Sequence, residues 1–340
     1  MINIGLIGCG YIGLRHIQAY AQIADQARVV ALCDIDTDSA QAINKYANEA
    51  RISGAMKDIF DDPEIEAVDI CLPNYLHREA IIAAANAGKH ILCEKPVSID
   101  RDSAVEVRRV LADANVTFMC AHNLLFSPAA QRARAMLDQN ILGELYEVRT
   151  FDISRWTPAS YPDVGWRGKR GMVGGGHLMD TGAHPLYVML YLMGKSPVTV
   201  SAMTSRHRMH EMEGEDSAQL LMEFDGGVIG HLATTYAYEL IDAGSHPTRP
   251  WFQVVGEFGQ LYGVGNELLH KPVDADARNI SLPAVDNYFV AELTEFASCV
   301  REQRPPMQTF EDAMAVLKIV LCAYQSVEER RHVQLASQDW

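Results

Sequence analysis

The segment Gly8-Cys9-Gly10-Tyr11-Ile12-Gly13 decides the fold of the first part of this chain. It directly follows Ile2–Ile7, an apolar run typical of a buried β-strand, and it opens a pattern typical of a helix. In such a unit the first glycine permits a tight turn, the second lets a pyrophosphate approach the backbone, and the third allows close helix–strand packing. The helix start adds unpaired N–H groups and a positive dipole end. The segment, Tyr11 and Ile12 included, therefore predicts a dinucleotide-binding turn.

Asp34 supports this prediction and indicates which dinucleotide binds. It stands 21 positions after Gly13, at the end of the predicted strand Arg28–Cys33, where a carboxylate accepts hydrogen bonds from the ribose hydroxyls. A 2′-phosphate about 4 Å away would be repelled by roughly 4 kcal/mol per charge pair at an effective dielectric near 20. The next residues, Ile35 and Asp36, supply no compensating cation. We therefore predict NAD rather than NADP, with Asp34 and Ile35 at the ribose.

The first 120 or so residues alternate strand-like and helix-like patterns. Continuous apolar runs are typical of strands that are buried on both faces, so we expect a parallel, doubly wound sheet of the Rossmann type. Besides the strands already named, we expect strands at Ala67–Cys71, His90–Cys93 and Val116–Cys120, and helices at Gly13–Gln22, Asp38–Glu49, Leu76–Ala87 and Asp100–Ala114.

The pattern changes after a predicted helix at Ser127–Asn140, because strands then follow one another without intervening helices. Asp225-Gly226-Gly227 between two of them indicates a hairpin turn. We therefore expect domains at 1–122 and 123–340, the second an α+β domain with a large, mostly antiparallel open sheet. The last two predicted helices either complete that domain or pack back on the first. The predicted strands are Leu145–Ser154, Val198–Arg206, Ala218–Phe224, Val228–Tyr236, Trp251–Gly256 and Gln260–Val264, and the last helices are Asn287–Glu302 and Glu311–Glu328.

Composition excludes several classes of protein. A chain of 340 residues is longer than one core usually organises. A formal net charge of −15 argues against nucleic acid and anionic membranes as partners. The seven cysteines form no C-x-x-C pair and lie mostly in apolar runs, which is typical of a reducing compartment. No apolar run is long enough to span a bilayer and no export signal is visible, so we expect a cytoplasmic protein.

Two further segments carry residues suited to chemistry. Cys93-Glu94-Lys95-Pro96 ends a predicted strand, and cofactors bind beyond the carboxyl ends of such strands, so Lys95 is expected near the nicotinamide. The second segment is Gly174-Gly175-Gly176-His177-Leu178-Met179-Asp180-Thr181-Gly182-Ala183-His184. If this run is helical, Asp180 and His184 share one face, although Pro185 makes the helix boundary uncertain.

Together these segments resemble the Gfo/Idh/MocA oxidoreductase family over almost the whole chain. The resemblance rests on Gly8–Gly13, Pro73-Asn74 with His77, Glu94-Lys95-Pro96, Phe126-Ser127-Pro128 and the pair Asp180 and His184. It implies a Rossmann domain followed by a domain whose open sheet mediates homodimers or homotetramers. It also implies that Lys95 contacts the reacting hydroxyl and the nicotinamide ribose, that Asp180 and His184 hold the substrate, and that His184 is the general base. Cofactor contacts are implied for Pro73, Asn74, His77, Glu94 and Lys95.

Elementary acid–base chemistry agrees with this assignment of the base. A histidine has an ordinary pKa near 6.5 and needs almost no tuning to accept a proton at neutral pH. A lysine would need its pKa lowered from about 10.4 to about 7–8, which costs about 3–5 kcal/mol. His184 is therefore expected to accept the proton, Lys95 to stabilise a developing alkoxide, and Asp180 to orient the imidazole or bind a neighbouring hydroxyl.

The resemblance does not extend to every substrate position. Many relatives have an arginine where this chain has Leu125, and an aspartate where it has Tyr187, so no named substrate can be carried over. Lys95, Asp180 and His184 are predicted substrate contacts. Four further residues are expected either to line the substrate pocket or only to pack near it: Arg155, Trp156, Trp166 and Arg167. His177 is also predicted to contact the substrate.

The spacing of His177, Asp180 and His184 matches no compact zinc motif, so we predict no metal. The reaction predicted is hydride transfer from a secondary alcohol of a sugar, cyclitol or similar polyol to NAD⁺. One alternative is a cis-dihydrodiol or carboxylated sugar acid as substrate, which a pocket lined by Arg167, Lys169 and Arg170 would favour. Another is a non-catalytic NAD-binding regulator, since fold does not fix function.

Overall fold

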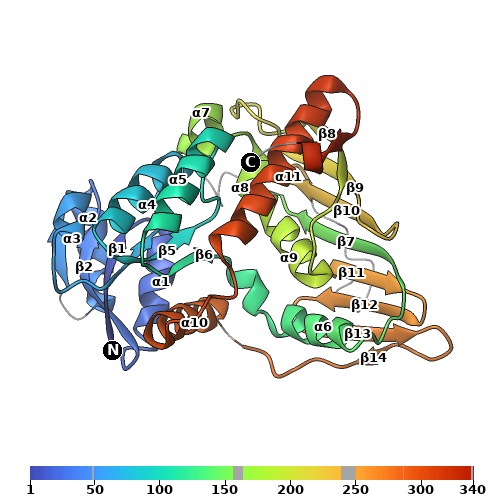
Figure 1. The fold of residues 1–340 in the computed structure, drawn as a ribbon, viewed down its shortest axis with the longest axis horizontal. Helices are drawn as coiled ribbons and strands as arrows, with labels where there is room; N and C mark the ends of the chain where they lie inside the picture. The colour runs from blue at the N-terminus through green and yellow to red at the C-terminus, as the bar shows by residue number, and fades with distance from the viewer. Residues whose placement is uncertain (48–49, 156–163, 239–249, 286, 338–339) are drawn as a thin grey trace. The chain divides into compact units, whose positions relative to one another are not determined.

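The computed structural model describes residues 1–47, 50–155, 164–238, 250–285, 287–337 and 340, and the chain divides into two compact units. Trp156 lies outside the residues that the structure describes. Unit 1 comprises Met1–Asn123 and Asn287–Met314, and unit 2 comprises Leu124–Asp286 and Ala315–Trp340. Each unit contains one sheet, parallel in unit 1 and mostly antiparallel in unit 2 (Figure 1). The predicted fold class is confirmed.

The sheet of unit 1 has the strand order β3-β2-β1-β4-β5-β6, and all of its pairs are parallel. This order reverses direction between β1 and β4, which is where open α/β sheets bind their ligands. The strands are β1 Ile2–Ile7, β2 Ala27–Cys33, β3 Arg51–Ser53, β4 Ala67–Ile70, β5 His90–Glu94 and β6 Phe118–Ala121. The helices are α1 Tyr11–Tyr20, α2 Thr37–Ile43, α3 Met56–Phe60, α4 His77–Asn86, α5 Arg101–Asp113 and α10 Tyr288–Glu302, with short 3₁₀ turns η1 Asn44–Tyr46 and η2 Asn74–Leu76.

Burial and capping explain why these segments take these forms. Ile4, Leu6 and Ile7 of β1 are fully buried, as a strand covered on both faces requires. The side chains of Asp36 and Asp100 accept hydrogen bonds from backbone N–H groups at the starts of α2 and α5, so each satisfies a donor that the helix leaves unpaired. Strand β3 and helix α3, of three and five residues, were not predicted.

Unit 2 is built on a nine-stranded sheet with the order β14-β13-β12-β11-β7-β10-β9-β8-β15. Its strands are β7 Leu145–Ile153, β8 Thr199–Ser205, β9 Ser217–Glu223, β10 Ile229–Thr235, β11 Pro250–Gly256, β12 Gly259–Val264, β13 Glu267–Pro272, β14 Arg278–Asn279 and β15 Val333–Gln334. Its helices are α6 Pro128–Asp138, α7 Arg170–Val173, α8 His177–Asp180 and α9 Ala183–Met193; η4 is Gly165–Gly168 and η5 is Leu335–Ser337. Helix α11 Phe310–Glu329 and η3 Asn123–Phe126 lie across the division between the units.

Most pairs in this sheet are antiparallel, but β7 and β10 pair in parallel. The predicted hairpin at Asp225-Gly226-Gly227 joins β9 to β10, and both glycines have positive φ, of 86° and 78°. Side chains of β9 alternate between buried and exposed, so one face of the sheet belongs to the core. Met203, Leu221 and Ile229 lie on the opposite face and are 79%, 57% and 44% exposed.

The segment from His177 to His184 does not form one continuous helix. Helix α8 ends at Asp180 and α9 begins at Ala183. Around the break, the Gly182 N–H donates to the carbonyl oxygen of His177 and the His184 N–H to that of Thr181. Pro185 has no N–H, so it suits the first turn of α9 and not the middle of a longer helix. A shared helical face for Asp180 and His184 therefore does not follow.

In the described part of the chain, no helix combines the length and the apolar character that crossing a membrane requires. All seven cysteines are buried, and none of them forms a disulfide bond.

Candidate functional site

The turn between β1 and α1 leaves room for a ligand at its backbone. Gly8 has φ +97°, and a Cβ there would lie 2.4 Å from the carbonyl oxygen of Cys71. A Cβ on Gly13 would lie 2.1 Å from the carbonyl oxygen of Gly8, so helix and turn touch where the sequence predicted close packing. A Cβ on Gly10 would meet nothing within 4 Å, and no side chain of the described residues caps the helix there. The turn thus offers open space and uncapped N–H groups, which suit a pyrophosphate.

Asp34 lies directly beside this turn. Its Oδ2 accepts a hydrogen bond of 2.7 Å from the Cys9 N–H, and its Oδ1 accepts one of 2.9 Å from the Asp36 N–H. These bonds fix the carboxylate at the end of β2. The side chains of Tyr11 and Ile35 are largely exposed, at 73% and 96%. The residues predicted to bind the dinucleotide are therefore brought together in unit 1.

The loops after β4 and β5 are tied to each other by His77. This residue is fully buried, and its Nδ1 and Nε2 lie 2.6 Å and 2.8 Å from the carbonyl oxygens of Pro96 and Leu72. Both ring nitrogens are occupied by the protein, so His77 positions the two loops and its ring does not offer a nitrogen to a cofactor. Pro73 begins the turn η2, and Asn74 within it is 3% exposed.

Lys95 follows β5 directly and is half-buried. Its backbone N–H donates to Oε2 of Glu94 at 3.2 Å, and its peptide bond to Pro96 is cis. His122, at the end of the neighbouring strand β6, is 1% exposed, and burial together with the Lys95 charge lowers the pKa of its imidazole to about 3. A neutral histidine thus lies close enough to Lys95 for the lysine charge to lower its pKa. The sequence analysis missed His122, although its place after a predicted strand was visible.

In unit 2, helix α8 is held by side chains that are remote in the sequence. Glu215 Oε1 accepts hydrogen bonds from the Leu178 N–H at 2.9 Å and from the Tyr324 hydroxyl at 3.0 Å. The Tyr324 hydroxyl in turn accepts one from the Gly176 N–H at 3.1 Å. His177 is fully buried, hydrogen bonds through Nε2 to the Thr234 hydroxyl and packs on the Tyr236 ring. His177 is therefore held by protein partners, and its predicted contact with substrate stays a prediction.

Asp180 is oriented by Arg167. The Arg167 Nε–H donates to Asp180 Oδ2 at 3.1 Å, and the guanidinium lies 4.3 Å from the centre of the Trp166 ring. Asp180 is 6% exposed. The neighbouring cation Lys169 lies 3.6 Å from Glu213. The basic cluster of the sequence is therefore partly neutralised by carboxylates of this same unit.

His184 lies in the first turn of α9 and is half-buried, whereas Arg155 is exposed and forms an isolated bridge with Ala237. Asp180 and His184 belong to unit 2 and Lys95 to unit 1. The joint action of these three residues stays a prediction.

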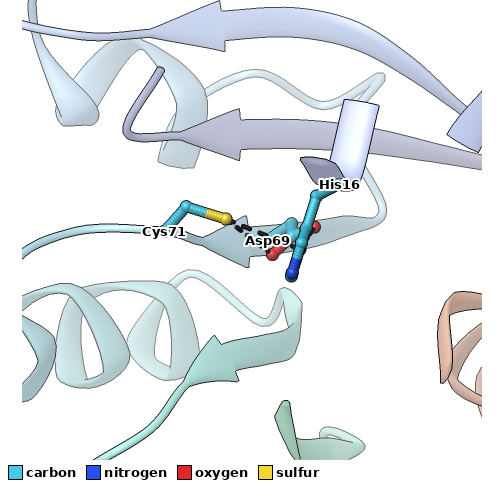
Figure 2. Close-up of side chains that lie close together, drawn as sticks. All are labelled: His16, Asp69 and Cys71. Carbon is cyan, nitrogen blue, oxygen red and sulfur yellow. Dashed lines mark hydrogen bonds and ion pairs between the residues drawn. The ribbon is translucent and has the colours of Figure 1, made fainter. Parts of the chain in front are cut away.

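A buried polar cluster in unit 1 was not predicted. His16, Asp69 and Cys71 lie together behind the dinucleotide turn (Figure 2), with His16 Nδ1 2.8 Å from Asp69 Oδ2 and the Cys71 thiol 3.4 Å from Asp69 Oδ1. Their potential ligand atoms lie within 4.8 Å of one another. Burial, with the Asp69 charge, raises the pKa of the Cys71 thiol. A thiol held protonated is a poor metal ligand, so these atoms are better described as a hydrogen-bonded set.

Comparison with known families agrees with this geometry. Residues 2–122 match the family described as "Oxidoreductase family, NAD-binding Rossmann fold", GFO_IDH_MocA. Residues 130–262 match the "GFO/IDH/MocA C-terminal domain". Unit 1 therefore contains an NAD-binding Rossmann domain, and the predicted cofactor is confirmed at that level.

Individual relatives extend the comparison. The levoglucosan dehydrogenase of Pseudarthrobacter phenanthrenivorans is 32% identical over 203 residues, 57% of this chain and 52% of that protein. The first-matched curated relatives are covered over only 52% to 61% of their length. The inositol 2-dehydrogenase of Rhizobium meliloti is 27% identical over 98% of this chain and 99% of its own. A levoglucosan dehydrogenase solved with NADH and levoglucosan has the same fold, with TM-score 0.87 and 23% identity over 98% and 99% of the chains.

Proposed function

Because this chain belongs to the Gfo/Idh/MocA oxidoreductase family, we propose that it transfers a hydride between a secondary alcohol and the nicotinamide of NAD. The alcohol belongs to a sugar, a cyclitol or a related polyol, the class that the names of the relatives indicate. The observation that carries the proposal is the Asp34 carboxylate, which the Cys9 N–H holds beside the open backbone at Gly10.

The residues that would hold the cofactor are those of the dinucleotide turn and of the strand ends beside it. Gly8, Gly10 and Gly13 leave space for the pyrophosphate, and Asp34 receives the ribose hydroxyls. Bound NAD⁺ would supply the hydride acceptor. Lys95 lies at the carboxyl end of β5, on the edge of the sheet where such ligands bind.

The remaining steps are assigned to the chain's own acids and bases. His184 accepts the proton of the substrate hydroxyl, since an imidazole is suited to this at neutral pH. The Lys95 ammonium stabilises the negative charge that develops on that oxygen. Asp180, held by Arg167, binds a neighbouring hydroxyl or orients the imidazole.

A carboxylated substrate is less well supported. Arg167 is paired with Asp180, and Lys169 lies 3.6 Å from Glu213, so these cations already have anionic neighbours. A neutral polyol needs no cationic partner, so its binding does not require these cations to leave their carboxylates.

The test is a panel of polyols, sugars, cis-dihydrodiols and sugar acids, each supplied with NAD⁺ while absorbance at 340 nm is followed. We expect turnover with at least one cyclic polyol and little with the acids. Tight NAD binding without oxidation of any alcohol would favour a non-catalytic NAD-binding regulator. Turnover confined to the acids would contradict the neutral substrate class.

We also propose that the open sheet face of unit 2 joins copies of this chain into a dimer or tetramer. Met203, Leu221 and Ile229 expose large apolar surface on that face, and such surface is commonly buried between subunits. Light scattering at micromolar concentration should give at least twice the 37.7 kDa of one chain. Leu221→Asp should shift it towards the monomer, and a monomeric wild type would contradict the proposal.

A further inference from the structure

In the cluster of His16, Asp69 and Cys71, the histidine lies between two carboxylates, that of Asp69 and that of the neighbouring Glu94. His16 extends from the second turn of α1 and is fully buried. Its Nδ1 lies 2.8 Å from Asp69 Oδ2 on β4, and its Nε2 lies 3.2 Å from Glu94 Oε1 at the end of β5. A neutral imidazole has only one N–H, whereas the imidazolium has two. The Nδ1 contact with Asp69 is a hydrogen bond, whereas the Nε2 contact with Glu94 is an ion pair without hydrogen-bond geometry. A ring with a carboxylate near each nitrogen favours the imidazolium, because opposite charges within about 4–6 Å stabilise the charged form.

Other titratable and aromatic groups also surround the ring. Burial raises the pKa of Cys71, Tyr20 and Glu292, and the Asp69 charge raises each further, whereas the His16 charge lowers the pKa of Cys71 and Glu292. The Phe289 ring packs against the imidazole, with centroids 5.2 Å apart. Burial alone would lower the pKa of His16, but the Asp69 charge raises it well above its ordinary value. One cation thus serves two buried anions, Asp69 and Glu94.

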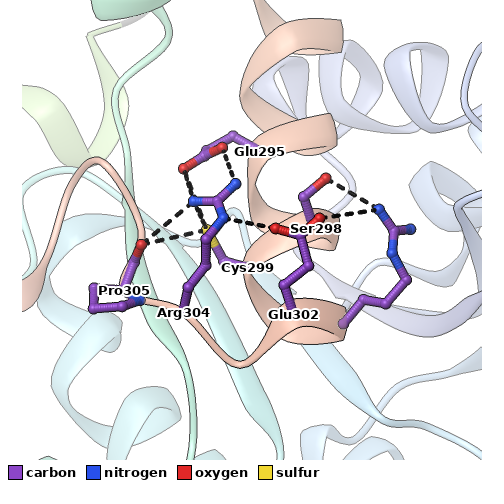
Figure 3. Close-up of polar contacts among 7 residues, drawn as sticks. Glu295, Ser298, Cys299, Glu302, Arg304 and Pro305 are labelled. Atoms are coloured by element: carbon purple, nitrogen blue, oxygen red, sulfur yellow. Dashed lines mark hydrogen bonds and ion pairs between the residues drawn. The ribbon is translucent and has the colours of Figure 1, made fainter.

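Helix α10, which supplies Phe289 and Glu292 to this cluster, is fixed at its far end. Arg304 binds both carboxylate oxygens of Glu295 at 2.7 Å and donates to Glu302 at 2.9 Å, and its Nη1 lies 3.0 Å from the Cys299 sulfur (Figure 3). A bidentate arginine pair gives orientation as well as attraction. Phe289 and Glu292, the residues of α10 that lie near His16, are therefore held in place by a helix that is itself anchored.

Glu94 connects His16 to the predicted catalytic lysine. One oxygen of its carboxylate faces His16, and the other accepts the Lys95 N–H at 3.2 Å. Burial would raise the pKa of Glu94, but His16 and then the Lys95 charge lower it. The carboxylate therefore stays ionised between two cationic residues. Without His16, the Glu94 Oε1 oxygen would face the buried Asp69 carboxylate across the space that the imidazole ring now fills.

We propose that His16 is a positioning residue for Lys95: clasped between Asp69 and Glu94, it holds the Glu94 carboxylate at the Lys95 backbone and so sets the place of the Lys95 side chain. His16 touches neither substrate nor cofactor in this arrangement. The role in catalysis rests on the function proposed above. The charge state of His16 does not, so the two can be tested separately.

The first test follows histidine imidazole ¹⁵N shifts in the full-length wild type, with His16→Gln used only for assignment. His16 should keep imidazolium shifts at pH values where an ordinary histidine, with a pKa near 6.5, is already neutral. His90 is the internal comparison, because burial lowers the pKa of this residue at the other end of β5. A neutral His16 at pH 7.5 would overturn the proposal, whether or not any substrate is known. So would a stoichiometric metal ion bound at His16 in the purified protein.

The second test measures kcat, the Kd for NADH and stability in His16→Gln, Lys95→Ala and the double variant. His16→Gln should lower kcat about tenfold to a hundredfold, the range expected when a catalytic group is misplaced, and change the Kd less than threefold. In the Lys95→Ala background it should lower kcat no further. Equal losses in both backgrounds would show that His16 does not act through Lys95.

A matched pair separates positioning from simple destabilisation. His16→Gln alone leaves the buried Asp69 carboxylate without its cation and Glu94 with only the Lys95 charge, so it will lower stability. His16→Gln combined with Asp69→Asn removes one charge of each sign and should recover much of the lost stability. If kcat stays low in that double variant, the positioning role is supported. If kcat returns to the wild-type value along with stability, the role is only structural. His90→Gln, at the start of the strand β5 that also carries Glu94, should leave kcat within twofold.

Discussion

The dinucleotide turn of unit 1 and the α8–α9 segment of unit 2 are both rich in glycine, yet they are held in different ways. The turn is fixed mainly by contacts of its own backbone: Gly8 against the Cys71 carbonyl, Gly13 against the Gly8 carbonyl, and the Cys9 N–H on Asp34. The α8–α9 segment is held by side chains from other elements, among them Glu215 and Tyr324.

In the proposed function, the turn binds the cofactor and the α8–α9 segment binds the substrate, so the two sites would be held in different ways. A site held by its own backbone tolerates side-chain changes elsewhere in the chain. A site held by remote side chains can be altered at any of them, so it can be adapted to a new substrate without disturbing the other. The variants at His184, Asp34 and Arg167 test whether cofactor binding and substrate turnover can be changed independently.

The largest effect is expected from the predicted base. His184→Asn keeps polarity and approximate size but removes the proton acceptor, so kcat should fall by about 10²–10⁴-fold. The Kd for NAD should stay within threefold, because the predicted cofactor contacts lie in unit 1. Steady-state kinetics and fluorescence titration measure the two. His207→Asn, an exposed histidine bonded to Ser205, is the matched control. Turnover near the wild-type value in His184→Asn would remove His184 from the mechanism.

The next largest effect is expected at Asp34, the carboxylate predicted to bind the ribose hydroxyls. Asp34→Ala removes charge-assisted bonds worth about 1.5–3 kcal/mol each, so NAD should bind about 10–100-fold more weakly. It also removes the repulsion of a 2′-phosphate, so the NAD/NADP affinity ratio should narrow. Titration of both cofactors measures this. Asp36→Ala, the control, removes only the helix cap of α2, with a stability loss of about 1 kcal/mol. An unchanged affinity ratio in Asp34→Ala would contradict the assignment.

A smaller effect is expected at the orienting arginine. Arg167→Gln releases Asp180 from a charged hydrogen bond worth about 1.5 kcal/mol, so KM for the alcohol should rise about tenfold. The Kd for NAD should not change. Lys169→Gln, which removes an exposed ion pair with Glu213, should do almost nothing to either quantity. A higher Kd for NAD in Arg167→Gln would mean that the two sites are not separate.

The smallest effect concerns pH. Burial would raise the pKa of Asp216, but N–H donors of Met209, Arg208 and His207 and the Ser217 hydroxyl lower it below its ordinary value. A lowered carboxyl pKa in the folded state stabilises the fold above the unfolded pKa, and this is lost as the pH falls through the folded pKa. Below about pH 4, the Tm of the wild type should therefore fall more steeply than that of Asp216→Asn. Parallel Tm–pH curves would exclude this contribution.

The sequence predicted unit 1 more fully than unit 2 because its signals are local. Strands β1, β2, β4, β5 and β6 are continuous apolar runs, and the glycine turn has a fixed spacing. The break between α8 and α9 was not predicted, since it depends on which carbonyls the Gly182 and His184 N–H groups reach.

The buried polar residues were the least visible. Asp69 stands between Val68 and Ile70 in an apolar strand, and nothing local indicates that it faces His16. His77 and His177 were predicted to contact ligands; both are fully buried with protein partners that the sequence did not indicate, and their ligand contacts stay predictions. Periodicity shows which side of an element is apolar, whereas these partners are decided by tertiary packing.

The measurement that tests the central claim most directly is the fate of the hydrogen on the carbinol carbon. An accepted polyol carrying deuterium at that carbon is oxidised with unlabelled NAD⁺ in ordinary water, and the reduced cofactor is examined by NMR and mass spectrometry. Direct hydride transfer predicts one deuterium at C4 of the nicotinamide and slower turnover wherever transfer limits the rate. Reduced cofactor without deuterium, or product formed with no reduced cofactor, would contradict the account.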